Sequence, residues 1–175
     1  MTAEQDRQFG AIISRLTRHE DLTREEAAEA FTTILTERTT PMQQGAFLGA
    51  LATKGETESE VAGAWEAICA LDTVKVKLDP ALPVVENSGT GMDTFKTFNI
   101  STAAAIVAAS QGVPMARHGA RAITSKRGTV DMAESLGVDV ECPPQIVAKS
   151  IENAGIGLFN GMSSAVHPRA LGRIL

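Results

Sequence analysis

Residues 83–116 read PVVENSGTGMDTFKTFNISTAAAIVAASQGVPMA, and this stretch decides the fold. Pro83–Glu86 has the composition of a short strand and runs into a turn at Ser88–Gly91. An Ala-rich helix follows from near Ser101, and Val113–Ala116 is a second short strand. Strand, helix and strand in this order predict parallel pairing in an α/β layer.

The alternation of helices and strands continues towards the C-terminus. Asp131–Leu136 predicts a helix, and Pro143-Pro144 opens another helix that ends before Gly155. Ile156–Phe159 then predicts a third strand. We therefore expect residues 75–175 to form an α/β lobe with a parallel sheet.

Residues 1–74 predict a bundle of four helices joined by short loops. Apolar residues recur at helical spacing between Phe9 and Leu16, which indicates the first helix. Each of the other three begins with Thr followed three positions later by Glu or Gln, the pattern of a capping box. The pairs are Thr23 with Glu26, Thr40 with Gln43, and Thr57 with Glu60. The fold class is α/β with an all-helical N-terminal domain.

Composition excludes several classes of protein. The 175 residues have a mass of 18.4 kDa, and 43% are apolar while 21% are charged, which excludes disordered and fibrous chains. Aromatic residues amount to 4% and the net charge is −5, which argues against RNA-stacking platforms and generic nucleic-acid binding. Cys69 and Cys142 lie far apart, which favours reduced thiols over a zinc site.

Nothing in the sequence indicates a membrane protein. The N-terminus lacks a basic stretch followed by an apolar core, and the apolar run Ala103–Ala109 is too short to span a bilayer. We expect a soluble, cytoplasmic protein.

Charge is distributed unevenly along the chain. Residues 1–75 hold seven Lys or Arg and thirteen Asp or Glu, a net charge of −6, whereas residues 76–175 hold nine and eight, a net charge of +1. Within the second part, the segment 94–130 contains five basic residues and no acidic one. A solvated basic face would explain this pattern. A pocket for a small polyanion is favoured, because Gly, Ser and Thr in the same segment supply further donors for phosphate oxygens.

Two polar segments flank the start of the Ala-rich helix. Gly89–Asp93 follows the first predicted strand, and its glycines allow backbone amides to approach an anion closely. Asn99–Thr102 opens the helix, where free N–H groups and the helix dipole favour anions. Taken singly, the first segment is equally consistent with a plain turn, and Ser101 with a helix N-cap.

Three more polar segments lie downstream. Arg117–Arg121 follows the second predicted strand, where parallel sheets bind ligands beyond the carboxyl ends of their strands. Ser125–Thr129 is a cationic loop before a helix, and His167–Arg169 follows the third strand. We interpret His118 as a positioning or phosphate-contacting residue rather than a general base, whereas a lone His167 is ordinarily structural.

Together these segments resemble the anthranilate phosphoribosyltransferase family, within the phosphoribosyltransferase and nucleoside phosphorylase superfamily with helical and α/β domains. The family patterns GTGGD, TFNIST, KHGNR and SKSG[ST] correspond to Gly89–Asp93, Thr97–Thr102, Arg117–Arg121 and Ser125–Thr129, with matching spacing. The N-terminal stretches at 23–27, 40–48 and 54–57 also match.

The resemblance implies a glycosyltransferase of tryptophan biosynthesis that uses phosphoribosyl pyrophosphate (PRPP) and Mg²⁺. The phosphoribosyl group would pass to the nitrogen of an aromatic acid, with release of pyrophosphate. The resemblance also implies a homodimer formed through the N-terminal helices. Such a reaction needs little acid–base chemistry, and we assign no catalytic residue.

By the same resemblance, Arg121 and His167 would lie near the acceptor, and Ser101 would ligate one Mg²⁺. The residues that would contact PRPP are Gly89, Thr90, Gly91, Asp93, Thr97, Asn99, Ser101, Thr102, Arg117, His118, Gly119, Ser125, Lys126, Gly128 and Thr129.

The sequence departs from the family pattern at several positions. Met92 stands in place of a glycine, Ala120 in place of an acceptor-binding asparagine, Arg117 in place of a lysine and Arg127 in place of a small residue. Family members continue beyond residue 175, into a part expected to hold an acidic pair for a second Mg²⁺. The alternative is therefore a non-catalytic or truncated relative that acts as a phosphate-binding, nucleotide-binding or regulatory module. Nucleic-acid binding is a third and less favoured hypothesis.

Overall fold

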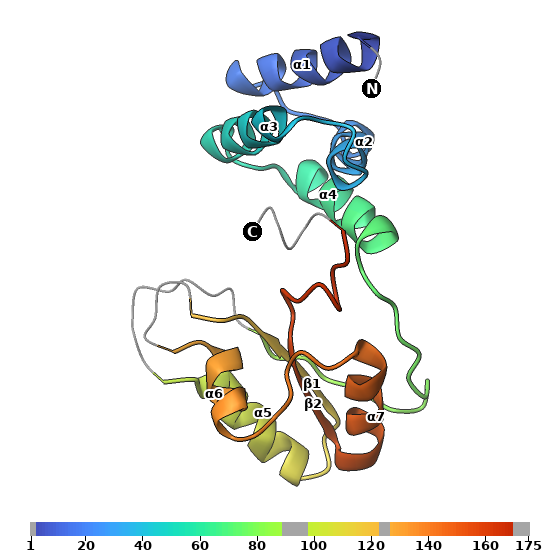
Figure 1. Ribbon diagram of the computed structural model, residues 1–175, viewed down its shortest axis with the longest axis vertical. Coiled ribbons are helices and arrows are strands. Elements are labelled where there is room, and N and C mark those ends of the chain that lie inside the picture. The colour runs from blue at the N-terminus through green and yellow to red at the C-terminus, as the bar shows by residue number, and fades with distance from the viewer. Residues whose placement is uncertain (1–2, 89–97, 123–126, 170–175) are drawn as a thin grey trace. The chain divides into compact units, whose positions relative to one another are not determined.

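The computed structural model describes residues 3–88, 98–122 and 127–169 (Figure 1). The chain folds as two compact units. The first contains the residues up to Thr73 together with Arg169, and the second is Val74–Pro168. Each unit has its own hydrophobic core.

Four helices make up the first unit, as the sequence predicts. They are α1 (Ala3–Thr17), α2 (Arg24–Leu35), α3 (Pro41–Lys54) and α4 (Glu58–Leu71). Helix α1 packs on α3, and α2 packs on α4 (Figure 1). The α2–α4 contact is close at Gly63, where an added Cβ atom would lie 2.2 Å from the backbone oxygen of Arg24.

The three predicted capping boxes are confirmed. At the start of α2, the Thr23 hydroxyl accepts the Glu26 N–H at 3.2 Å, and the Glu26 carboxylate accepts the Thr23 N–H at 2.9 Å. The same reciprocal pair occurs at the starts of α3 and α4. Two otherwise unpaired N–H groups are satisfied in each box, which fixes where each helix begins.

The core of the helical unit is centred on Phe47, which is fully buried. Its ring lies 5.5 Å from that of Phe9 and 5.6 Å from that of Phe31, measured between ring centroids. Burial of such a side chain contributes about 1.5–3 kcal/mol. These three rings therefore link α1, α2 and α3 into one core.

An ion pair is buried beside this core. The Lys54 ammonium lies 2.9 Å from the Glu60 carboxylate, and their side chains are 3% and 1% exposed. Glu60 also accepts hydrogen bonds from the Leu22 and Thr57 N–H groups. Burial opposes ionisation of Glu60, but these bonds outweigh it and lower the pKa of Glu60.

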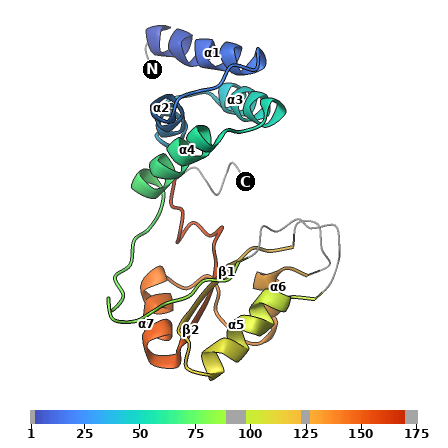
Figure 2. The ribbon, with the colours of Figure 1, turned by 180° about the vertical axis from the view of Figure 1, so that it is seen from behind.

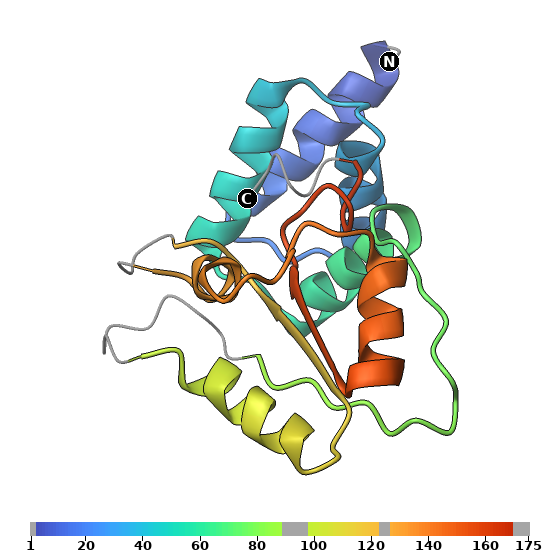
Figure 3. The same cartoon turned by 60° about the horizontal axis from the view of Figure 1, so that its bottom comes forward.

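The second unit contains α5 (Ile100–Ser110), β1 (Met115–Gly119), α6 (Thr129–Ser135), α7 (Pro144–Ala154) and β2 (Ile156–Asn160). Strands β1 and β2 are parallel, as the sequence predicts, with Met115 opposite Ile156 and Gly119 opposite Asn160. Helices α5 and α6 lie on one side of the strand pair and α7 lies on the other (Figures 1 and 2). Figure 3 shows the two strands side by side.

Two of the predicted strands have different boundaries in the structure. The predicted strand at 83–86 is reduced to one parallel bridge between Val85 and Met115. Strand β1 begins at Met115 because the Val113 N–H is still bonded to Ala108 at the end of α5. The strand then runs on to Gly119, so the segment predicted as a loop after it begins inside the strand.

Neither cysteine forms a disulfide, and burial raises the pKa of the Cys142 thiol. Within the described ranges, no helix is both long and apolar enough to cross a membrane.

Candidate functional site

The candidate site lies at the carboxyl ends of the parallel strand segments, where open α/β sheets bind ligands. Ser88 follows the bridge residue Val85, and His118 and Gly119 end β1. Helix α5 begins beside them, since the Asn87 amide donates to the backbone oxygen of Ser101 at 2.8 Å. Residues far apart in the sequence therefore meet at one edge of the sheet.

Arg117 is buried inside this site, with 7% of the residue exposed. Its Nη1 donates to the Ser88 hydroxyl and to the backbone oxygen of His118. Its Nη2 donates to the Thr129 hydroxyl at 3.3 Å. Burial lowers the pKa of the guanidinium, and the neighbouring Glu86 carboxylate partly offsets that effect.

His118 lies at the open side of the same cluster. Its Nδ1 is 3.1 Å from the Ser88 hydroxyl and 3.2 Å from the Glu86 carboxylate. Burial opposes ionisation of Glu86, but hydrogen bonds from Ser88 and the charges of His118 and Arg117 lower its pKa. Gly161 lies against the imidazole, where an added Cβ atom would be 2.9 Å from His118 Cδ2.

The start of α5 differs from the N-cap hypothesis for Ser101. The helix begins at Ile100, so Asn99 is the N-cap and Ser101 lies within the first turn. Among the described residues, Thr102 Oγ1 is one of three buried side-chain atoms without a hydrogen-bond partner. Thr102 is 0% exposed. A buried hydroxyl without a partner is costly, and this one lies in the first turn of α5.

The end of β1 and the residues just after it lie close to the start of α6. An added Cβ atom on Gly119 would lie 2.5 Å from Thr129 Cβ, and one on Gly128 would lie 2.5 Å from the backbone oxygen of Ala120. The Asp131 carboxylate accepts the N–H groups of Gly128 at 2.7 Å and Ala122 at 3.0 Å. These bonds lower the pKa of Asp131.

Arg121, expected near the acceptor, points to carboxylates of its own chain. Its two terminal nitrogens each lie 2.8 Å from one oxygen of Glu134, and one of them is 3.1 Å from Glu141. Asp131 lies 3.7 Å away. The bidentate bond to Glu134 is the largest of the effects that raise the pKa of Arg121.

The structure therefore brings together part of the predicted set. Arg117, His118, Gly119, Gly128 and Thr129 form one contiguous cluster, and Asn87 connects Ser101 to its edge. His167 lies in the turn after β2, with its N–H bonded to the Ser163 oxygen at 2.9 Å. The remaining predicted contacts, Gly89, Thr90, Gly91, Asp93, Thr97, Ser125 and Lys126, lie outside the described residues.

Comparison with protein families gives this arrangement its context. The a/b domain of a glycosyl transferase family matches residues 81–171, which is more than half of the chain. The chain belongs to this glycosyl transferase family. The helical bundle domain of the family matches residues 11–71. The resemblance noted from the sequence motifs is thereby confirmed at the level of the family.

Two relatives of this chain are anthranilate phosphoribosyltransferases from bacteria. Over 160 residues the chain is 41% identical to the anthranilate phosphoribosyltransferase of Thermomicrobium roseum, covering 91% of this chain and 45% of the relative. The crystal structure of anthranilate phosphoribosyltransferase from Thermus thermophilus superposes with a TM-score of 0.81 at 33% identity, covering 94% of this chain and 48% of that one.

A more distant structure shows the same fold. The anthranilate phosphoribosyltransferase of Saccharomyces cerevisiae, in complex with PRPP and Mg, has a TM-score of 0.76 at 24% identity, over 93% of this chain and 48% of that one. The chain spans about half the length of the relatives it matches.

Several residues of the candidate site are not predicted from the sequence. Asn87, Ser88 and Asp131 connect the loops, although none was predicted as a site residue. Asn87 and Ser88 follow a predicted strand immediately before a glycine loop, and that position was the available indication. For Asp131, the only indication was its place three residues after Gly128 at a helix start.

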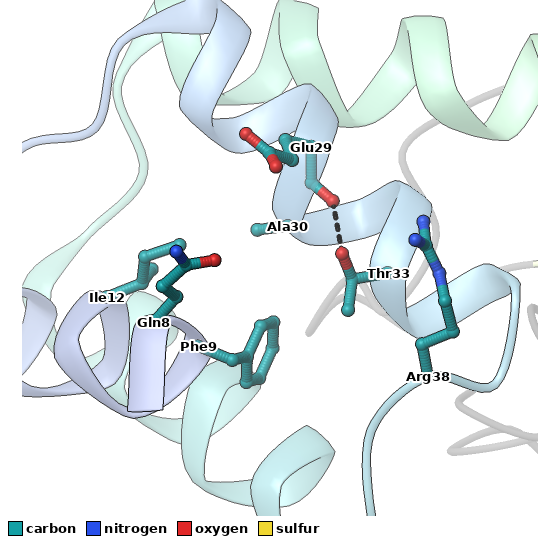
Figure 4. Close-up of a pocket in the computed structure, with 7 residues that line it drawn as sticks. All are labelled: Gln8, Phe9, Ile12, Glu29, Ala30, Thr33 and Arg38. Atoms are coloured by element: carbon teal, nitrogen blue, oxygen red, sulfur yellow. Dashed lines mark hydrogen bonds between the residues drawn. The ribbon is translucent and has the colours of Figure 1, made fainter. Parts of the chain in front are cut away.

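A hollow in the helical unit contains none of these residues. It has a volume of about 100 Å³ between α1 and α2 (Figure 4). The apolar residues that line it are Phe9, Ile12 and Ala30, and the polar ones are Gln8, Glu29, Thr33 and Arg38. The Thr33 hydroxyl donates to the backbone oxygen of Glu29 at 2.8 Å, within its own helix (Figure 4).

Proposed function

We propose that the protein is a phosphoribosyltransferase of the anthranilate type. It binds PRPP at the carboxyl ends of the parallel strands and transfers the phosphoribosyl group to an aromatic acceptor, with release of pyrophosphate. The observation that carries this proposal is the start of α5, where the buried Thr102 hydroxyl has no partner among the described residues. It lies beside Asn87–Ser88 and His118–Gly119, which hydrogen bonds join to each other and to α5. Its similarity to anthranilate phosphoribosyltransferases supports the same reaction.

The chemistry suits a site rich in donors. Cleavage of the bond between the sugar C1 and the pyrophosphate oxygen leaves a developing anion on pyrophosphate and a cationic sugar. Preorganised N–H and hydroxyl donors stabilise the departing anion, and they need no reorganisation during the reaction. The first turn of α5, including Ser101 and Thr102, offers such donors to a phosphate. The PRPP contacts expected in the segments 89–97 and 123–126 remain part of the proposal.

Mg²⁺ fits the chemistry of the residues present. It takes oxygen ligands and keeps several waters, and it is bound through one or two protein groups plus substrate phosphates. We propose the Ser101 hydroxyl as one such ligand. The described residues contain no group of three or more His, Cys, Asp or Glu side chains placed to hold a metal. When bound, Mg²⁺ neutralises charge on the leaving pyrophosphate.

The acceptor would lie near Arg121 and His167, with Arg121 as a candidate partner for its carboxylate. Because Arg121 is paired with Glu134 and Glu141, an anionic acceptor has to compete with these carboxylates. The assignment of residues 1–74 to a dimerisation domain and 75–175 to a PRPP-binding lobe stays a prediction, as does a cytoplasmic location.

The proposed homodimer forms through the N-terminal helices. A groove of about 370 Å³ runs between α1 and α3 and is lined in part by the small residues Gly45, Ala46 and Gly49. An added Cβ atom on Gly45 or Gly49 meets nothing within 4 Å, so a helix of a second copy can approach closely there. Sedimentation of Ala46→Glu tests this, and an unchanged dimer would place the interface elsewhere.

Calorimetric titration of PRPP with and without Mg²⁺ tests the function directly. We expect Mg²⁺-dependent binding that Ser101→Ala weakens. Ser110→Ala at the other end of α5 is the matched control, because among the described residues the Ser110 hydroxyl bonds only locally, to the Val107 oxygen and the Gln111 side-chain amide. Absence of binding at millimolar PRPP would overturn the proposal.

Pyrophosphate release then separates catalysis from binding. Release that depends on anthranilate supports the transferase. PRPP binding without release, with anthranilate or other aromatic acids present, would instead support a phosphate-binding or regulatory module. Salt-dependent retention of DNA would favour nucleic-acid binding.

A further inference from the structure

Arg117 occupies an unusual place for a cation. It lies in the middle of β1, opposite Leu158 of β2, and it is 7% exposed. Arginine is almost never buried unless it is paired. The other two basic residues of the segment 94–130 that the structure describes, Arg121 and Arg127, are both exposed. Arg117 therefore has a different role from its basic neighbours.

The terminal nitrogens of Arg117 reach three separate segments. Nη1 bonds the Ser88 hydroxyl, on the segment that follows the Val85 bridge. The same nitrogen bonds the His118 backbone oxygen near the end of β1, and Nη2 bonds the Thr129 hydroxyl at the start of α6. Thus one side chain joins the residue before Gly89–Asp93 to the end of β1 and to the start of α6.

The same contacts commit most of the guanidinium donors to the protein. Three of its five N–H groups, two on Nη1 and one on Nη2, donate to Ser88, His118 and Thr129. The Nε donor is buried and has no partner among the described residues. The sequence hypothesis made Arg117 a direct phosphate contact, as a basic residue in an acid-free segment suggests. The geometry instead directs its donors to the loops that surround the ligand.

We infer that Arg117 is a positioning residue that holds the Ser88, His118 and Thr129 segments in the geometry for binding a phosphorylated ligand. Lysine cannot do the same, because its donors sit on a single nitrogen, whereas the planar guanidinium presents donors in a fixed fork. The identity of the ligand in this inference rests on the proposed function. The effect of Arg117 on the three segments in the ligand-free chain does not depend on it.

Amide hydrogen exchange of the ligand-free chain tests the inference without any substrate. The amides of Ser88, Gly128 and Val130 donate to Glu86, Asp131 and Ala120. We expect Arg117→Lys and Arg117→Met to speed exchange at these amides by about tenfold or more, with no change in α7. Lys149→Met, an exposed substitution on α7, is the control. Unchanged exchange at all three amides would overturn the inference.

Binding of PRPP with Mg²⁺ distinguishes positioning from direct contact. A direct charge contact predicts that Arg117→Lys retains most of the affinity and Arg117→Met loses it. Positioning predicts that both variants lose affinity to a similar degree, about tenfold or more. It also predicts non-additivity: Ser88→Ala weakens binding in the wild-type background and has little further effect with Arg117→Met. Rescue by lysine, or additive losses, would contradict it.

The two hypotheses fail in different ways. If the wild-type chain binds no PRPP, the proposed function fails while the exchange experiment still decides the role of Arg117. If the wild type binds PRPP and both variants keep its affinity and its exchange rates, the positioning role alone fails. Circular dichroism of each variant checks that a loss reflects the loops rather than global unfolding.

Discussion

The Lys54 ammonium and the Glu60 carboxylate lie 2.9 Å apart with both side chains almost completely buried. Removal of one partner leaves the other charge buried without its ion pair, which costs about 3–5 kcal/mol in such pairs. We expect Lys54→Met to lower the free energy of unfolding by an amount near the low end of that range, because Glu60 keeps the Leu22 and Thr57 N–H bonds. Urea unfolding followed by Trp65 fluorescence measures it.

Lys149→Met is the control for that substitution, and we expect it to leave the unfolding midpoint unchanged, because Lys149 is exposed. An equal loss in both variants would show that the buried pair is not the cause.

The same pair predicts a pH dependence of stability. The pKa of Glu60 is lowered below its ordinary 4.5, so its contribution is present above about pH 4.5 and is lost as the pH falls through the folded value. The pKa of Lys54 is raised above 10.5, chiefly by its bond to Asp21, so its contribution is lost only as the pH rises above that value. Urea midpoints measured across pH should fall less steeply in acid for Glu60→Gln than for the wild type. Equal slopes would contradict this.

Glycines at two helix positions should respond oppositely to alanine. In α4, Gly63→Ala places a methyl group 2.2 Å from the Arg24 oxygen and should destabilise the α2–α4 contact. In α1, Gly10→Ala meets nothing within 4 Å and should stabilise the helix by up to about 1 kcal/mol. Thermal unfolding of the two variants tests the difference in sign, which equal shifts would refute.

Asp131 should control the loop that its carboxylate closes. Asp131→Asn weakens the bonds to the Gly128 and Ala122 N–H groups, so we expect faster exchange at both amides and weaker PRPP binding. Because its pKa is lowered, acidification below its ordinary 3.8 should produce the same loosening in the wild type. The exposed substitution Glu152→Gln on α7 is the control. If it speeds exchange at the Gly128 and Ala122 amides as much as Asp131→Asn does, the Asp131 bonds are not the cause.

Arg121 offers a test of the acceptor site. If it binds the acceptor carboxylate, Glu134→Gln should raise the affinity for anthranilate several-fold, because the bidentate bond that competes for the guanidinium is weakened. Calorimetry in the presence of PRPP measures the change. Unchanged affinity in both Glu134→Gln and Arg121→Met would make Arg121 a structural residue.

Local patterns predicted much of this fold because their physical causes are local. The capping boxes at Thr23, Thr40 and Thr57 need only residues three positions apart, and all three form. The parallel pairing of β1 and β2 follows from strand–helix–strand order. The strand at 83–86 was predicted too long, because its pairing depends on the register of β1 and not on its own composition.

The site was less predictable, since its contacts join distant segments. Sequence marks Arg117 and Arg121 alike as basic residues in an acid-free segment. Only the fold shows that Arg117 is buried among Ser88, His118 and Thr129, and that Arg121 meets carboxylates from outside that segment. The difference arises because Arg117 lies within β1, whereas Arg121 follows β1 and meets Glu134 of α6.

The bond from the Asn87 amide to the Ser101 oxygen affects the entropy cost of ligand binding. These two residues lie on either side of the segment 89–97, and Ala122 and Gly128 lie on either side of the segment 123–126, joined through Asp131. The entropy of bringing the ends of each segment together is a cost of folding rather than of binding. Loss of Asn87 or Asp131 should therefore weaken ligand binding, because part of that entropy cost then falls on the binding step.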